Sequence, residues 1–355
     1  MAARGTCGHV CHQLSDTGVR SSCGGPVATI WLLQSHSTRA GFRRADFRLA
    51  GRADSDSRWH GCRYCLAAVQ RPTRSRARRA FGHNGCESRP VSPVHAPRNG
   101  AQLGREGIVL AGAGAAIALQ VAHRSVAAGV QQHSNFTTDP LGRLLRTLQY
   151  IFAIVLPEAQ TATDSVTNWV KQAHKPVAGF VDGARYSAAD PQTQRWVTAT
   201  LYWTAEQIRW RIWGEQHPDD AEEIYRSYAV LGTALGMPQD AWPQDRQAFQ
   251  RYWDQHVSAL EVSDSARHIM AELFAAKSAP GWLRAAMPLA RFLTAGLLPA
   301  QIRTQFDLAW DGGDSQREDL LWRMLRHTYP RLPAGLQHLP ARLVVSGLSK
   351  QRLGY

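Results

Sequence analysis

The chain has 355 residues, of which 44% are hydrophobic, enough for one large domain or two ordinary ones with a buried core. A net charge of +13 ordinarily points to an anionic partner, but residues 1–100 hold 16 Arg, no Lys and five acidic residues, a net +11, and the other 255 residues carry only +2. This uneven distribution argues against nucleic-acid binding by the larger part of the chain, and we predict no nucleic-acid partner.

The first 98 residues show no sustained helical or strand period, and they contain all six cysteines. The pair Cys62 and Cys65 is the only CxxC spacing, so the second ligand pair of a zinc module is missing. We predict a largely disordered, basic segment over residues 1–98. Two interpretations remain open. The segment is either a basic arm for nucleic acid or anionic lipid, or the product of translation upstream of the true start and not part of the natural protein.

No segment of the sequence has the features of a signal peptide or a membrane span. The apolar stretch at 26–33 is short and lies late in the chain. The longest apolar run, 107–122, has 16 residues, fewer than the roughly 20 that cross a bilayer. We therefore expect a soluble, cytoplasmic protein.

From residue 105 onward the pattern is helical. The helix beginning at Pro218 ends near Gly236, and the last long helix begins with Ser315 and Glu318 at capping-box spacing and ends at Pro330. No stretch alternates strictly enough to predict a strand. The fold class is therefore all-α, a single helical-bundle domain over 99–340 followed by a C-terminal tail, 341–355. The predicted helices are 105–129, 140–156, 161–173, 190–213, 218–236, 244–258, 263–277, 282–297 and 315–330.

Two glycines, Gly112 and Gly114, lie in the apolar run "VLAGAGAAIA". Their spacing partly matches a dinucleotide-binding turn, but the third glycine position is Ile117. Small residues at this spacing also allow a second helix or a flat ligand to approach closely. We favour that second interpretation.

Three histidines, His123, His133 and His174, lie in otherwise apolar or turn-like sequence. Imidazole binds metal or haem iron, moves protons near neutral pH, or serves as a hydrogen-bonded structural group. Arg143 and Thr147 are spaced by one helical turn, so both side chains can face the same pocket.

The tryptophans of the predicted helix 190–213 recur every seven residues, at Trp196, Trp203 and Trp210. A stripe at helical spacing is typical of a core, and in a haem or lipid pocket it would also form a wall.

Four blocks of sequence, 105–147, 171–179, 186–203 and 292–310, resemble the bacterial relatives of the latex-clearing rubber oxygenases and of the fungal mycophenolate-pathway oxygenase. The resemblance covers about 105–330. It implies a helical bundle that encloses haem b, in a family whose characterised members cleave carbon–carbon double bonds of isoprenoid chains with dioxygen.

The resemblance also implies roles for individual residues. Arg143 and Thr147 match the pair on the distal side of the haem, where a cation and a hydroxyl can orient dioxygen. The histidine that holds the iron in the haem-binding members falls on Thr198, and a hydroxyl is a poor axial ligand. His174 and His123 are then the candidate haem iron ligands.

Two further positions belong to the implied site. His133 matches a recurring histidine of the family, and Arg195 is placed to pair with a haem propionate or to be a solvated helix end. The resemblance therefore predicts a haem-dependent oxygenase with dioxygen and a hydrophobic, isoprenoid-like substrate. The alternative is a non-enzymatic or haem-free binding protein that kept the fold after losing the ligand histidine.

Overall fold

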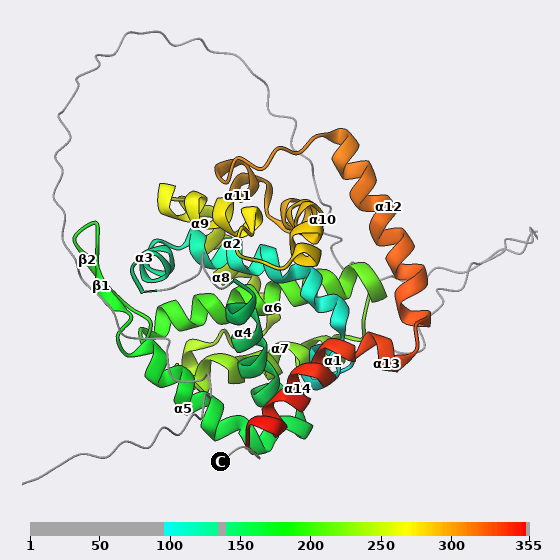
Figure 1. Cartoon of the computed structure of the whole chain (residues 1–355), viewed down its shortest axis with the longest axis horizontal. Coiled ribbons are helices and arrows are strands. Elements are labelled where there is room, and N and C mark those ends of the chain that lie inside the picture. Colours follow the sequence, from blue (N-terminus) through cyan, green and yellow to red (C-terminus); the bar gives the residue numbers. More distant parts are fainter. Residues whose placement is uncertain (1–95, 134–139, 353–355) are drawn as a thin grey trace, which may run out of the picture. The chain divides into compact units, whose positions relative to one another are not determined.

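The computed structural model describes residues 96–133 and 140–352, all within one compact unit, Gly85–Tyr355 (Figure 1). Side chains at 140, 141 and 349–352 are not described. The predictions made for residues 1–95, including disorder and the Cys62–Cys65 pair, lie outside the described residues.

The described unit is all-α apart from one small hairpin, which confirms the predicted fold class. Its first half contains α1 (Gly100–Arg105), the 3-10 helix η1 (Gly107–Gly112), α2 (Ala113–Ala122), α3 (Arg124–His133), α4 (Pro140–Val155), η2 (Pro157–Ala162), α5 (Thr163–His174), β1 (Ala178–Val181), β2 (Ala184–Ser187) and α6 (Pro191–Trp213). Its second half contains α7 (Pro218–Thr233), η3 (Gln239–Ala241), α8 (Arg246–Ser258), α9 (Asp264–Ala275), α10 (Gly281–Leu297), α11 (Ala300–Gln305), α12 (Gly312–Thr328), η4 (Tyr329–Arg331), α13 (Ala334–Gln337) and α14 (Leu339–Arg352).

The hairpin corrects the prediction that no strand is present. β1 and β2 pair antiparallel, with Ala178 opposite Ser187 and Val181 opposite Ala184. Asp182 and Gly183 connect them with positive φ values of 51° and 79°. An Asp-Gly pair with both residues at positive φ is a strong hairpin signal, but four-residue strands are too short to show an alternation.

The first predicted helix, 105–129, is broken into three pieces. His123 has an extended backbone conformation, with φ −77° and ψ 122°, and separates α2 from α3.

Residues 341–355, predicted as a tail, include most of α14. No single helix in the described part of the chain is long and apolar enough to span a membrane. The segments 107–122 and 124–133 together have the length and composition of a membrane span, but they are bent by 100° relative to each other.

The capping box of α12 lies earlier than predicted. The Asp311 carboxylate accepts from the Asp314 backbone N–H at 2.8 Å, and the Asp314 carboxylate accepts from the Asp311 N–H at 3.2 Å. Ser315 and Glu318, the predicted pair, therefore lie inside the helix. The prediction was wrong because Asp caps as well as Ser does, and here two aspartates have the same three-residue spacing.

Helix α6 is at the centre of the unit and packs against η1, α2, α7 and α12 (Figure 1). Its N-cap residue Asp190 accepts a hydrogen bond of 3.0 Å from the Thr193 N–H. Trp196 is 1% exposed, and Trp253 of α8 stacks on both Trp196 and Trp203. Trp210 is 53% exposed, so the predicted tryptophan core holds for the first two positions and not for the third.

Gly114 lies inside helix α2 and allows close packing with α10. A Cβ at this position would stand 2.1 Å from Oγ1 of Thr294. Residues 107–122 are helical throughout, so the strand required by a dinucleotide-binding turn is not present there. The glycine therefore serves helix packing, as the second interpretation predicted.

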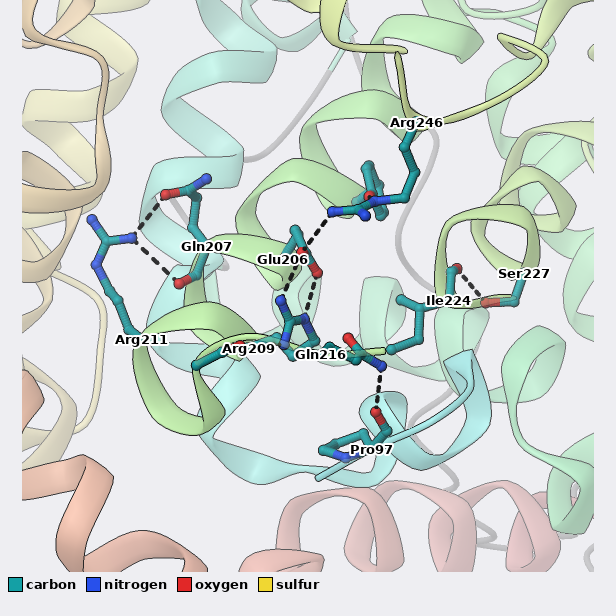
Figure 2. Close-up of polar contacts among 11 residues, drawn as sticks. Pro97, Glu206, Gln207, Arg209, Arg211, Gln216, Ile224, Ser227 and Arg246 are labelled. Carbon is teal, nitrogen blue, oxygen red and sulfur yellow. Dashed lines mark hydrogen bonds and ion pairs between the residues drawn. The ribbon is translucent and has the colours of Figure 1, made fainter. Parts of the chain in front are cut away.

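A buried ion pair fixes the second half of α6. Arg209 donates two hydrogen bonds to the Glu206 carboxylate, at 2.7 and 2.9 Å (Figure 2). A third hydrogen bond from Arg209 reaches the Gly214 carbonyl at 2.9 Å. Arg246 of α8 lies 3.4 Å from the same carboxylate. The side chain of Arg209 is 4% exposed, so water does not reach its contacts within α6, whereas Arg246, which joins the cluster to α8, is 41% exposed.

Candidate functional site

One face of α4 carries the predicted distal pair. Arg143, Thr147 and Tyr150 are spaced four and seven residues apart and therefore lie along the same side of the helix. Thr147 is exposed, and its hydroxyl donates to the Arg143 carbonyl at 3.0 Å. Buried Tyr150 donates to the carbonyl of Leu231 on α7 at 2.5 Å, and burial raises its pKa, so the hydroxyl stays a donor. This bond holds the Arg143 face of α4 against α7.

Arg143 and His174 are two titratable groups of this site, and they interact electrostatically. Burial, with the nearby charge of Arg146, lowers the pKa of Arg143 to about 10, so its guanidinium remains charged at neutral pH. Burial, with the charge of Arg143, lowers the pKa of His174. The site thus combines a fixed cation with a neutral imidazole. Among the described residues no hydrogen bond engages the His174 ring.

A chain of hydrogen bonds connects the end of α5 to the start of α6. The Val177 N–H donates to the His174 carbonyl at 3.0 Å, and the Ala188 N–H donates to the Val177 carbonyl at 2.9 Å. Gln194 then donates its side-chain amide to the Ala188 carbonyl at 3.3 Å. The amide oxygen of Gln194 is buried without a partner in the described part of the chain. His174 and the first turns of α6 are therefore held in one arrangement.

Thr198, the position to which the resemblance assigns the ligand histidine, is 3% exposed. Its hydroxyl donates to the Gln194 carbonyl at 2.9 Å, one turn back along α6. A Cβ on Gly232 of α7 would stand 2.9 Å from this hydroxyl and 2.6 Å from Cε of Met237. Thr198 thus faces α7 and the buried Met237 side chain, and the space around it is filled.

His123 lies on a different side of α6. Its ring centroid is 6.3 Å from that of Trp196, and Trp196 and Thr198 are about 200° apart around the helix. Burial lowers the pKa of His123, an effect that Asp190 opposes and His256 reinforces. Nδ1 of His123 is buried and has no hydrogen-bond partner in the described residues. The structure therefore does not bring His123 together with Thr198.

The two remaining predicted residues make contacts within the protein. Arg195 donates to the Ala241 carbonyl at 3.2 Å and lies 4.6 Å above the Tyr252 ring, so it packs on α8 and is not a solvated helix end. His133 lies 3.2 Å from the Tyr186 hydroxyl, and that hydroxyl donates to Gln132 at 2.7 Å. Because Tyr186 has only one hydrogen to donate, Nε2 of His133 is the donor between them, which joins α3 to β2.

Several residues of the site were missed from the sequence. Tyr150 could have been found, because it follows Arg143 by seven residues on a predicted helix. No sequence pattern marked Gly232 and Met237 as neighbours of Thr198, because that proximity depends on how α7 packs against α6. His256 of α8, which lies 6.3 Å from Trp196, was missed for the same reason.

Within the described residues, no group of three or more His, Cys, Asp and Glu side chains is placed to hold a metal ion. A haem iron needs only one protein ligand, and a neutral imidazole is the most common. His174 meets that chemical requirement beside Arg143. Thr198 does not, because its hydroxyl is already bonded and Met237 fills the adjacent space.

Comparison with known proteins gives one family match. A family model described as "ER-bound oxygenase mpaB/B'/Rubber oxygenase, catalytic domain" matches residues 101–329, which include every predicted site residue. Uncharacterized proteins of Mycobacterium bovis and Mycobacterium tuberculosis are each 28% identical over 216 residues, covering 59% of this chain and 84% of the relative. No solved structure matches significantly.

Proposed function

This chain belongs to the family of ER-bound and rubber oxygenase catalytic domains, and from that premise we propose that it acts with dioxygen on a hydrophobic, isoprenoid-like substrate at the Arg143 face of α4. We further propose that it uses haem b held by His174. The observation that carries the proposal is the neutral imidazole of His174 within the electrostatic reach of the Arg143 cation.

When bound, haem supplies an iron that binds and activates dioxygen. With haem in place, the Arg143 guanidinium would be the cation available to stabilise negative charge on a bound oxygen species. The hydroxyl of Thr147 can rotate from the Arg143 carbonyl to donate a second hydrogen bond. The hydrophobic nature of the substrate is inferred from the family.

The proposal is tested by the absorbance spectrum of the full chain, purified and reconstituted with haemin. We expect a Soret band that shifts with dithionite and with carbon monoxide, and that is lost or moved in His174→Ala. His123→Ala is the matched control, because it also removes a partly buried imidazole, one that lies near Trp196. A Soret band unchanged in His174→Ala would overturn the assignment of the ligand.

A second candidate function is a haem-free protein that binds the hydrophobic compound without oxidising it. The packing of Met237 and Gly232 around Thr198 favours this candidate, because it fills the place of the family's ligand. It predicts no Soret band in the wild type after reconstitution, together with saturable binding of an isoprenoid probe such as geranylgeraniol, measured by tryptophan fluorescence. A Soret band lost in His174→Ala would exclude it.

A further inference from the structure

Four leucines near the C-terminus, Leu332, Leu336, Leu339 and Leu343, project into solvent. They are 42%, 58%, 41% and 62% exposed, whereas buried leucines of the core are below 9%. All four lie beyond residue 329, where the family match ends. We call these leucines, with the neighbouring Arg331 and Arg342, the C-terminal leucine patch. It is a run of apolar surface that the oxygenase-type site does not use.

The fold holds the leucine patch in place. Tyr329 donates its hydroxyl to the buried Glu106 carboxylate at 2.7 Å, and Nε2 of His338 lies 3.3 Å from the other oxygen of that carboxylate. Gln337 donates to the Tyr329 carbonyl at 2.9 Å. These contacts attach η4 and α13 to the start of η1, so the leucines lie on a fixed surface.

Helix α14 is covered on one side only. Its side chains Ala341, Val344 and Val345 pack against α4. The α4 residues in this contact are Leu148 and Phe152. Leu339 and Leu343 lie away from this contact and remain exposed. In the described part of the chain, nothing covers the outer side of α14.

The charged residues of the leucine patch, Arg331 and Arg342, are both cations, and of the two carboxylates that interact with His338, Glu106 is buried and Glu158 is paired with Arg105. The sequence contains no Asp or Glu after Asp319. Arg331 and Arg342 are exposed, and neither forms an ion pair with a carboxylate of the described residues. The patch therefore combines protruding apolar side chains with uncompensated cations, which favours an anionic partner.

Two other binding partners fit the leucine patch less well than an anionic one. A second copy would bring the same cations face to face, and a leucine coiled coil needs a continuous helix, whereas this stripe is interrupted at Pro333 and at His338 between α13 and α14. The chain's own residues 1–95 carry a net positive charge, so they too would be repelled.

We propose that the C-terminal leucine patch docks the protein on an anionic phospholipid membrane. The leucines enter the boundary between headgroups and acyl chains, and Arg331 and Arg342 bind lipid phosphates. A lipid surface needs no matching pocket for isolated leucine side chains, unlike a folded protein partner. The inference does not depend on whether the oxygenase-type site is active.

The test measures co-sedimentation of the full chain with vesicles of phosphatidylcholine and phosphatidylglycerol, and with vesicles of phosphatidylcholine alone. We expect binding to the anionic vesicles, weakened by salt. The double variant Leu336→Ser/Leu343→Ser should lose roughly tenfold in affinity, because two leucines no longer enter the bilayer. Arg331→Gln/Arg342→Gln should lose at least about fivefold, and the corresponding lysine variants should retain binding.

The matched control is Trp282→Ser/Leu289→Ser, which removes two exposed apolar side chains of α10, 67% and 54% exposed, and should bind as the wild type does. Thermal unfolding of each variant checks that the fold is intact. Because every variant keeps residues 1–95, equal binding by the patch variants and the wild type would assign membrane binding to another segment and overturn the proposal. Absence of vesicle binding, or a dimer abolished by Leu336→Ser/Leu343→Ser, would overturn it as well.

Discussion

The hydroxyl of Thr198 donates to the carbonyl of Gln194 at 2.9 Å, and its other side faces Gly232 and Met237. Thr198 is thus a satisfied core residue in a place where the resemblance predicts an iron ligand. Thr198 and Met237 are both buried, and a methyl added at Gly232 would meet both of them, so a larger side chain at residue 198 would have to displace its neighbours on this side of α6. The packing around residue 198 therefore suits a threonine hydroxyl.

We predict that Thr198→His alone gains no haem coordination, whereas Thr198→His/Met237→Ala does. Removing the Met237 thioether chain frees volume for an imidazole. The measurement is the absorbance spectrum after haemin reconstitution, in a His174→Ala background so that the native candidate ligand is absent. Met237→Ala without the histidine is the control. A Soret band in Thr198→His alone would show that Met237 does not obstruct the position.

The contact between α6 and α7 predicts a coupling between Gly232 and Thr198. Gly232→Ala places a methyl 2.9 Å from the Thr198 hydroxyl, and such overpacking costs about 1–3 kcal/mol, against a gain of up to about 1 kcal/mol from the better helix propensity of Ala. In a Thr198→Ala background the contact with the Thr198 hydroxyl is removed, while the contact with Cε of Met237, at 2.6 Å, remains. Urea unfolding of the wild type, the two single variants and the double variant should give a coupling of about 1 kcal/mol or more in the free energy of unfolding. Additive effects of the two substitutions would contradict the close contact.

The sequence predicted most of the fold and only part of the site. The fold class followed from the 3.6-residue period, and the ends of α4, α6 and α10 lie within two residues of prediction because proline and capping residues mark them. The break at His123 was missed, since a single extended residue does not disturb an apolar pattern.

The candidate site was harder to predict, because it depends on which faces of α4 and α6 meet their neighbours. Spacing predicted that Arg143 and Thr147 share one face of α4, which the helix confirms, whereas their distal role stays a prediction from the resemblance. The surroundings of Thr198 were not, because Met237 follows α7 in a turn and reaches residue 198 only through tertiary packing.

Protonation of two histidines should make stability depend on pH. Burial lowers the pKa of both His123 and His174, while the unfolded chain has histidines with a pKa of about 6.5. Below about pH 6.5 the unfolded state binds more protons, so the free energy of unfolding should fall as the pH drops toward the folded pKa values and then level off.

The pH effect is checked by urea unfolding at a series of pH values above and below about 6.5. His123→Gln and His174→Gln should each flatten the curve, and the double variant should flatten it further because the two side chains lie in separate surroundings. A wild-type stability that rises on acidification through this range would contradict the lowered pKa values.

Two ion pairs, the buried Glu206–Arg209 pair of α6 and the surface pair Glu272–Lys277, should differ in how much they contribute to the free energy of unfolding. Glu206→Gln removes the charge that faces the Arg209 guanidinium, whose side chain is 4% exposed, and breaking such a pair costs roughly 3–5 kcal/mol. Glu272→Gln removes the partner of Lys277, which is 78% exposed, and should cost less than about 1 kcal/mol.

Both costs are measured by urea unfolding of the full chain at neutral pH. Replacing the whole pair, in Glu206→Leu/Arg209→Met, should cost less than Glu206→Gln alone, because no buried charge is then left without a partner. If Glu206→Gln were as mild as Glu272→Gln, Arg209 would have to reach another acceptor. The carbonyl of Gly214, already bonded to it at 2.9 Å, accepts a hydrogen bond but supplies no compensating negative charge.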